Sequence, residues 1–303
     1  MSTDFSLLQL PGGVNIAYEV LGASFLGRRR PIVLISGLSI VRKDWALLSH
    51  TLSQSRPVLV YDHRGIGDSV CSPSAVEEIS IENMALDLFS LLIHLQWKEF
   101  AICGWSMGGV VAQQLLVLPF HPRYPLALPF RVTHVFLAGT RSVVLQANKH
   151  GFQKRVLSNT FDPMWLQQNQ GRFETLFRGW LSGVRPAAVI GIVDFSFLSP
   201  YSLPIYLLQK FPAKQQQAVA SFNIQYLLPY IPRDIKVLVI HGELDQIIPF
   251  SAGREIPSFI PSARFMPIGP SAGQVWSTTF GHFWFQYFDI DMWREVLESH
   301  MSS

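Results

Sequence analysis

The sequence predicts an α/β fold in which helices flank a mostly parallel central sheet. Short runs rich in β-branched residues, such as Pro31–Ser36 and Lys236–Ile240, show no alternation of apolar and polar residues. Such runs are typical of strands that are buried on both faces of a parallel sheet. Helix-like stretches lie between them, and in Ile81–Leu95 the apolar residues recur with a period near 3.6 residues. This alternation of strands and helices is the pattern of an α/β fold.

The predicted elements follow one another in a simple order. The chain opens with a β-hairpin, Phe5–Leu10 and Asn15–Leu21, which turns at Pro11–Gly13. The later predicted strands are Pro31–Ser36, Pro57–Tyr61, Phe100–Cys103, Val132–Leu137 and Lys236–Ile240, and the predicted helices between them are Ile81–Leu95 and Gly108–Leu118.

The strand–helix rhythm stops at Arg141 and resumes near Lys236. No convincing strand lies between Arg141 and about Tyr230, and the stretch is rich in aromatic residues, among them Phe161 and Trp165. We interpret residues 141–230 as a helical cap inserted over the carboxyl edge of the sheet. Residues 1–140 and 231–303 then form the α/β core.

Composition excludes several classes of protein. The net charge is only +3 and no block of Lys or Arg occurs, so we expect no nucleic-acid partner. Hydrophobic residues make up 49% of the 303 residues, which excludes a disordered chain. Cys71 and Cys103 are too few for a disulfide framework or a zinc site, and we expect neither a metal nor a cofactor.

The chain shows no secretory signal and no apolar run of about 18 residues, so we expect no membrane-spanning helix. A cytoplasmic location is therefore the prediction. The sequence does not predict an oligomeric state.

The strongest chemical signal is the hexapeptide GWSMGG at residues 104–109. It follows the predicted strand FAIC and opens the predicted helix GVVAQQLLVL. A G-x-S-x-G in this context is a nucleophile elbow, a sharp turn that exposes the serine hydroxyl. The glycines are needed because a Cβ two positions from the serine would collide in so tight a turn. Ser106 is therefore the candidate nucleophile.

A nucleophilic serine needs a base, and the base needs an orienting acid. Asp245 follows the predicted strand VLVI by a few residues, and ligands bind at such carboxyl ends of strands. Glu243, earlier in the same turn, is the rival acid. His282 is the candidate base, because it is late in the chain and is preceded by glycine. We expect the segment FWFQYF after it to be helical.

Other histidines fit the role of base less well. His300 lies in a polar tail, and His63 and His241 precede the candidate acid in the chain.

An oxyanion hole also needs two N–H donors. We expect one from Met107, directly after the nucleophile, and the other from Leu38, in the turn Ser36–Ser39 after the strand PIVLIS.

Four motifs stand together in one order: the elbow GWSMGG, the loop DHRGIGDS, the turn HGELDQIIP and the final FGH. With them the chain resembles the α/β-hydrolase superfamily, in its capped esterase-like and epoxide-hydrolase-like branch. The resemblance covers nearly the whole chain outside the insertion. It implies nucleophile Ser106, acid Asp245, base His282, oxyanion donors Leu38 and Met107, and a helical cap after the strand VTHVFLAG.

The sequence departs from the family in one turn, where Ser36–Gly37 stands in place of the usual His-Gly. The nucleophile is serine rather than aspartate, which argues against epoxide hydrolase and haloalkane dehalogenase activity. We therefore expect a cofactor-free serine hydrolase that cleaves an ester or similar acyl bond of a small molecule with an apolar part. A carbon–carbon bond hydrolase, an acyltransferase and a non-catalytic ligand-binding protein on the same scaffold stay open as alternatives.

Overall fold

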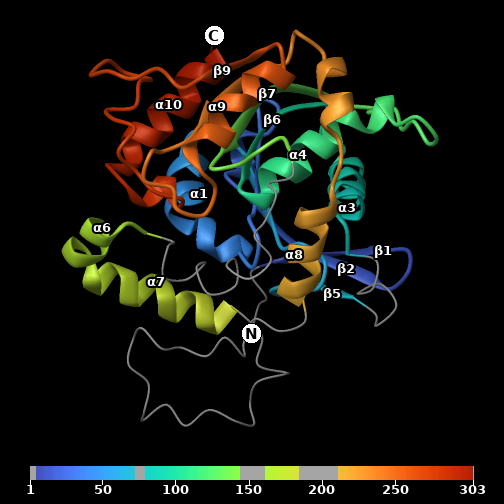
Figure 1. Ribbon diagram of the computed structural model, residues 1–303. Helices are drawn as coiled ribbons and strands as arrows, with labels where there is room; N and C mark the ends of the chain where they lie inside the picture. Colours follow the sequence, from blue (N-terminus) through green and yellow to red (C-terminus); the bar gives the residue numbers. More distant parts are fainter. Residues whose placement is uncertain (1–4, 72–78, 144–160, 184–210, 303) are drawn as a thin grey trace.

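The computed structural model describes residues 5–71, 79–143, 161–183 and 211–302. Within them nine strands form one sheet, in the order β1-β2-β4-β3-β6-β7-β8-β9, with β5 paired to β2 (Figure 1). From β4 to β9 all neighbours are parallel, and β1, β2 and β5 add antiparallel pairs. The strands are β1 (Ser6–Leu10), β2 (Val14–Leu21), β3 (Ile32–Ile35), β4 (Val58–Tyr61), β5 (Val70–Cys71), β6 (Glu99–Trp105), β7 (Arg131–Ala138), β8 (Lys236–Ile240) and β9 (Ala263–Phe265).

This architecture confirms the predicted α/β fold with its mostly parallel sheet and flanking helices. The described α-helices are α1 (Ala46–Ser53), α3 (Ile81–His94), α4 (Met107–Val117), α6 (Pro163–Gln168), α7 (Gln170–Gly183), α8 (Phe211–Ser221), α9 (Phe250–Phe259) and α10 (Ile290–Ser302). Short 3-10 turns are η1 (Ala23–Phe25), η2 (Arg42–Trp45), η3 (Leu118–Phe120), η7 (Gln225–Tyr230) and η8 (Trp284–Gln286).

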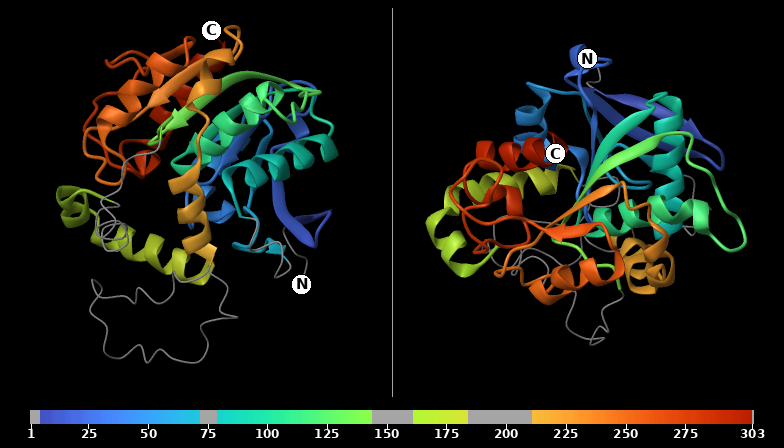
Figure 2. Two further views of the ribbon diagram at one scale, coloured as in Figure 1. Left: turned by 45° about the vertical axis from the view of Figure 1, so that its right-hand side comes forward. Right: turned by 90° about the horizontal axis from the view of Figure 1, so that it is seen from above.

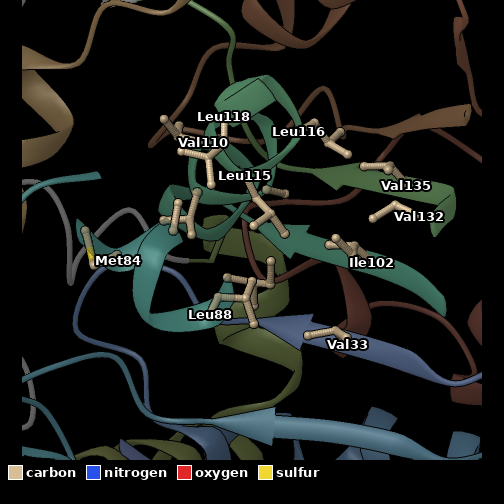
Figure 3. Packing of buried hydrophobic residues seen from close by; sticks show 14 of the residues in the cluster. Val33, Met84, Leu88, Ile102, Val110, Leu115, Leu116, Leu118, Val132 and Val135 are labelled. Atoms are coloured by element: carbon tan, nitrogen blue, oxygen red, sulfur yellow. The ribbon is translucent and has the colours of Figure 1, made fainter. Parts of the chain in front are cut away.

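Two hydrophobic clusters bury the sheet. One joins the strands to α3 and α4, whose side chains, such as Leu88 and Leu115, meet Val33 and Ile102 of the strands (Figure 3). The other joins the opposite face to α1 and α10. The helix α3 begins where its sequence predicts, because the Ser80 hydroxyl accepts a hydrogen bond from the amide N–H of Asn83 (3.0 Å) and so caps the first turn.

Between β7 and β8 the described residues form the helices α6, α7 and α8, the 3-10 turn η7 and short connections, and no strand, as predicted. Helix α7 lies against η2, and α8 lies against α3 (Figure 2). The predicted division into residues 1–140 with 231–303 and a cap of 141–230 stays a prediction, and parts of that cap lie outside the described residues.

The aromatic residues at the start of the insertion pack against the core. The rings of Phe161 and Trp165 are stacked at a centroid distance of 3.8 Å, and Phe161 also contacts Phe283 and Tyr287. Phe161 is 1% exposed and Trp165 7%. These two side chains therefore fix the insertion to the residues that follow His282, and they give no support to an aromatic substrate pocket.

The prediction of a helix directly after His282 is wrong for most of its length. Only Trp284–Gln286 forms a single 3-10 turn, and α10 begins at Ile290. The backbone leaves the helical region at Phe283 (φ −84°, ψ 57°) and at Phe288 (φ 63°). The carbonyl of Tyr287 accepts the indole N–H of Trp293 (2.6 Å) in place of a helical N–H.

Several features are absent from the described part of the chain. No helix in it is both long enough and apolar enough to cross a bilayer. The two thiols, Cys71 and Cys103, are both free. Within the same ranges, no group of three or more His, Cys, Asp or Glu side chains is arranged to hold a metal ion.

Two buried histidines lie at the amino end of the parallel strands. Arg30 Nη1 donates to His134 Nδ1 (3.2 Å), and Arg264 Nη2 donates to His300 Nδ1 (3.2 Å). The two imidazole rings lie 5.3 Å apart. Burial lowers the pKa of each to about 4, helped by neighbouring cations. Both rings are therefore neutral in the folded protein at neutral pH.

We predict that the free energy of unfolding falls as the pH is lowered from about 6.5 to 4. In this window the unfolded chain binds protons that the folded chain excludes, and each histidine contributes up to about 1.4 kcal/mol per pH unit. Urea unfolding at pH 7 and pH 5 measures the loss, which His300→Gln is expected to reduce. His50→Gln, at an exposed position of α1, is the matched control. An equal loss in wild type and His300→Gln contradicts the prediction.

Candidate active site

Ser106 lies in a strained turn between β6 and α4. Its backbone has φ 56° and ψ −121°, in a region that residues with a side chain rarely adopt. The amide N–H of Ser106 donates to the carbonyl of Ala138 (2.9 Å), and the Thr140 hydroxyl donates to the Ser106 carbonyl (2.6 Å). The end of β7 therefore holds the turn in its strained conformation.

Glycine is required on both sides of Ser106. A Cβ on Gly104 would lie 2.5 Å from the Gly108 carbonyl oxygen, and a Cβ on Gly108 would lie 2.1 Å from the carbonyl oxygen of Ile35. These contacts are too short for any side chain. The start of α4 thus packs directly against the end of β3.

The structure brings His282 and Asp245 together. His282 Nδ1 lies 2.8 Å from Asp245 Oδ2, and both side chains are buried. The other carboxylate oxygen, Oδ1, accepts the backbone N–H groups of Ile247 and Ile248 (2.9 Å each). Glu243, the rival acid, is exposed.

The environment of Asp245 favours its charged form. Burial opposes ionisation, but the charge of His282 and hydrogen bonds from His241 and His282 outweigh it and hold the pKa of Asp245 well below its usual range. A carboxylate that stays ionised can orient and stabilise an imidazolium.

His241 is a second imidazole on the same carboxylate, and the sequence analysis assigned it no such role. Its Nε2 donates to the Ile248 carbonyl (3.0 Å) and lies 3.3 Å from Asp245 Oδ2. Its ring fills the space that a Cβ on Gly253 would need, since that Cβ would lie 2.2 Å from Nδ1. The spacing of four residues between His241 and Asp245 was the available signal.

His282 is fixed beside the nucleophile turn through the residue that precedes Ser106. The indole N–H of Trp105 donates to the His282 carbonyl (2.9 Å), and the two rings lie 5.7 Å apart. On the other side, a Cβ on Gly139 would lie 3.3 Å from His282 Nδ1. The Ser106 hydroxyl has no hydrogen bond to any described residue, and such bonds often tighten only when substrate is bound.

The turn after β3 contacts the nucleophile. A Cβ on Gly37 would lie 3.1 Å from Ser106 Cβ and 3.6 Å from its Oγ. The Met107 N–H, at the first residue of α4, has no helical partner by geometry. The Leu38 N–H has no hydrogen-bond partner within the described ranges. Among the described residues, neither of these two N–H groups has a hydrogen-bond partner, and Met107 directly follows the serine.

Ser36, where the family usually has histidine, is supported by two distant side chains. The Trp45 indole N–H donates to its hydroxyl (3.0 Å), and His63 Nε2 donates to its carbonyl (3.0 Å). Burial lowers the pKa of His63 to about 4. His63, which sequence reasoning weighed only as a base, is thus a neutral support for this turn.

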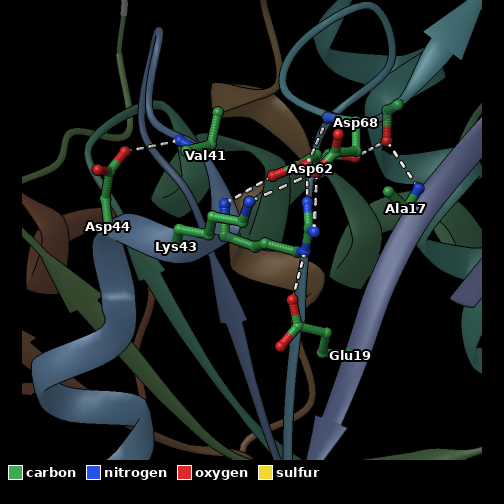
Figure 4. A network of polar contacts seen from close by, with 9 residues as sticks. Ala17, Glu19, Val41, Lys43, Asp44, Asp62 and Asp68 are labelled. Carbon is green, nitrogen blue, oxygen red and sulfur yellow. Dashed lines mark hydrogen bonds and ion pairs between the residues drawn. The ribbon is translucent and has the colours of Figure 1, made fainter. Parts of the chain in front are cut away.

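A buried arginine fixes the segment that follows the turn (Figure 4). The Arg42 side chain contacts Asp62, donates to Glu19 (2.7 Å) and donates to Asp68 (2.9 Å), while its backbone N–H donates to Asp62 Oδ1 (2.6 Å). The carboxylates come from β2 and from the loop after β4. The network therefore joins η2 to the loop DHRGIGDS.

Comparison with known proteins gives a consistent family. A family model described as "alpha/beta hydrolase fold" matches residues 30–272. A relative named as the carbamate hydrolase RutD of Cronobacter turicensis is 28% identical over 157 residues, which are 47% of this chain and 55% of that protein. A relative named as a non-heme chloroperoxidase of Synechocystis sp. is 25% identical over 290 residues, covering 86% of this chain and 89% of the relative.

Solved structures share the fold at lower identity. The enol-lactonase of Burkholderia xenovorans LB400 superposes with a TM-score of 0.71 at 19% identity, over 98% of this chain and 100% of that chain. At this identity the likeness concerns the fold.

We predict that Gly108→Ala abolishes the folded site. The new Cβ must displace the end of β3 or the start of α4, which is expected to lower the free energy of unfolding by about 3 kcal/mol or more. Urea unfolding measures this. Gly171→Ala, where a Cβ meets nothing within 4 Å, is the matched control and is expected to be neutral or slightly stabilising. Similar behaviour of the two variants would refute the packing argument.

Proposed function

Because this chain belongs to the α/β-hydrolase fold family, we propose that it is a serine hydrolase that cleaves a carboxylic ester or similar acyl bond. One observation carries the proposal. The imidazole of His282 lies 2.8 Å from the buried Asp245 carboxylate, beside the strained turn that presents Ser106. Membership of this family supports a hydrolase activity. What we propose beyond it is that the hydrolase acts on esters through a nucleophilic serine.

In the proposed mechanism, His282 Nε2 removes the proton of the Ser106 hydroxyl as its oxygen attacks the acyl carbon. Asp245 accepts the Nδ1–H of His282, fixes that tautomer and stabilises the imidazolium. The N–H groups of Leu38 and Met107 stabilise the oxyanion. The protonated His282 then donates to the leaving group, and water activated by the same imidazole hydrolyses the acyl-enzyme.

Two of the similar proteins are named for substrates in which the acyl carbon is bonded to a heteroatom, a lactone and a carbamate. An enol-lactone is a cyclic ester, and a carbamate is an acyl group between heteroatoms, so both fit attack at an acyl carbon. We propose a small-molecule substrate with an apolar part. Carbon–carbon bond hydrolysis with the same triad is the second candidate, and turnover of p-nitrophenyl esters against a panel of diketones separates the two.

A cytoplasmic location stays a prediction from the sequence.

Labelling with a fluorophosphonate probe tests the nucleophile. The probe phosphonylates only an activated serine, so we expect rapid labelling of the wild-type chain and none of Ser106→Ala. Ser258→Ala, at an exposed serine of α9, is expected to label as wild type does. Mass spectrometry of the labelled peptide identifies the site. Persistent labelling of Ser106→Ala, or no labelling of wild type, excludes the proposal.

Asp245→Asn tests the acid against its rival. The amide cannot stabilise the imidazolium and favours the wrong tautomer of His282, so kcat is expected to fall by about 10⁴. Glu243→Gln removes the charge of the exposed carboxylate in the same turn and is expected to leave kcat unchanged. Ester hydrolysis by the two variants gives the comparison, with circular dichroism to confirm folding. The opposite pattern would make Glu243 the acid.

A further inference from the structure

The helix α8 reaches the proposed oxyanion turn through the side chain of Gln215. Gln215 is 0% exposed, and its Oε1 accepts the backbone N–H of Ser39 (3.1 Å). Ser39 directly follows Leu38, whose N–H is a proposed oxyanion donor. A residue 176 positions away in the chain thus holds the peptide next to that donor.

The turn needs such a restraint, because its backbone is strained. Ser39 has φ 64°, in the left-handed region. This conformation is unfavourable for a residue with a side chain, because its Cβ approaches the following carbonyl oxygen. Within the turn, the Ile40 N–H makes a long bond to the Gly37 carbonyl (3.3 Å). The bond from Ser39 to Gln215 opposes relaxation of the turn, and the direction of the Leu38 N–H depends on the same backbone.

Helix α8 is itself anchored to the core on a second side. Arg141, just after β7, donates from Nη2 to the Val219 carbonyl (3.1 Å), and its guanidinium lies 5.8 Å from the centre of the Phe222 ring. Ala218 and Phe222 are buried in the same cluster as α3 and α4. Gln215 therefore extends from a fixed helix and can hold the turn in place.

Only the oxygen of the Gln215 carboxamide has a hydrogen-bond partner among the described residues. Its Nε2 is buried and has no hydrogen-bond partner among the described residues, and the same holds for the Ser39 hydroxyl. A buried polar group without a partner destabilises the fold, because it has lost its hydrogen bonds to water. A donor left unpaired beside the oxyanion turn is suited to an acceptor atom of a bound substrate.

We propose that Gln215 is a positioning and specificity-determining residue of this active site. Its Oε1 holds the oxyanion turn through Ser39, and its Nε2 donates to a second acceptor oxygen of the substrate, close to the scissile carbonyl. The preferred substrates are then esters or lactones whose acyl part carries such an oxygen. This inference rests on the proposed serine-hydrolase function.

The positioning role is tested by the second-order rate of fluorophosphonate labelling, together with kcat and KM. Gln215→Met keeps the length of the side chain and removes the acceptor, and it is expected to slow labelling and lower kcat by about tenfold, which is less than removal of a whole oxyanion donor. Gln215→Glu keeps an acceptor for Ser39 and is expected to label several-fold faster than Gln215→Met. Gln217→Met, at an exposed position of α8, is the matched control and is expected to behave as wild type. Thermal unfolding verifies that each variant is folded.

The specificity role is tested with two esters of equal shape, p-nitrophenyl butanoate and p-nitrophenyl methoxyacetate. They differ in one position, where the second has an ether oxygen. The ratio of their kcat/KM values in each variant is divided by the wild-type ratio, so that the difference in intrinsic reactivity cancels. One lost hydrogen bond is expected to reduce the preference for the methoxyacetate by about fivefold in both Gln215→Met and Gln215→Glu, and not in Gln217→Met.

The outcomes separate this inference from the proposed function. If wild type labels at Ser106 but Gln215→Met labels equally fast, or Gln215→Glu is as slow as Gln215→Met, the positioning role is wrong and the serine hydrolase stands. If the ester ratio is the same in all four proteins, the donor role is wrong. If wild type does not label, the serine-hydrolase proposal itself fails.

Discussion

The arrangement of this site depends on the strained backbone of Ser106. A serine at φ 56° persists only where its surroundings hold it. Here the carbonyl of Ala138 and the hydroxyl of Thr140 bind its two backbone groups, and glycine at 104 and 108 leaves the turn room. The parallel sheet supplies these restraints, because β3, β6 and β7 end side by side.

The same edge of the sheet gathers residues that are far apart in the chain. The turn after β3 contacts Ser106, and the turn after β8 carries Asp245 to His282. The strand order β3-β6-β7-β8 places these ends next to one another. Parallel pairing of β3 with β6 thus brings the turn at Gly37 to within a few ångströms of Ser106, 69 residues later in the chain.

Local patterns were enough to predict the fold and to choose Ser106, Asp245 and His282 as candidates. The strands are continuous apolar runs, and the elbow has a steric signature that lies within six residues. The contacts made by Gln215 and His63 could not be predicted in this way. Each links a side chain to a backbone group in another part of the fold, and nothing in the neighbouring sequence marks it. The segment after His282 was mispredicted because its conformation depends on distant or later side chains: the indole N–H groups of Trp105 and Trp293 bind the carbonyls of His282 and Tyr287.

The serine at position 36 has a consequence for protein engineering. Its hydroxyl and carbonyl are occupied by Trp45 and His63, which come from two other segments of the chain. The turn is therefore a composite module whose parts are not adjacent in sequence. A His-Gly turn transplanted from another hydrolase would remove the hydroxyl that accepts the Trp45 indole N–H but would keep the backbone carbonyl that accepts from His63, so a successful graft must exchange positions 36 and 45 together.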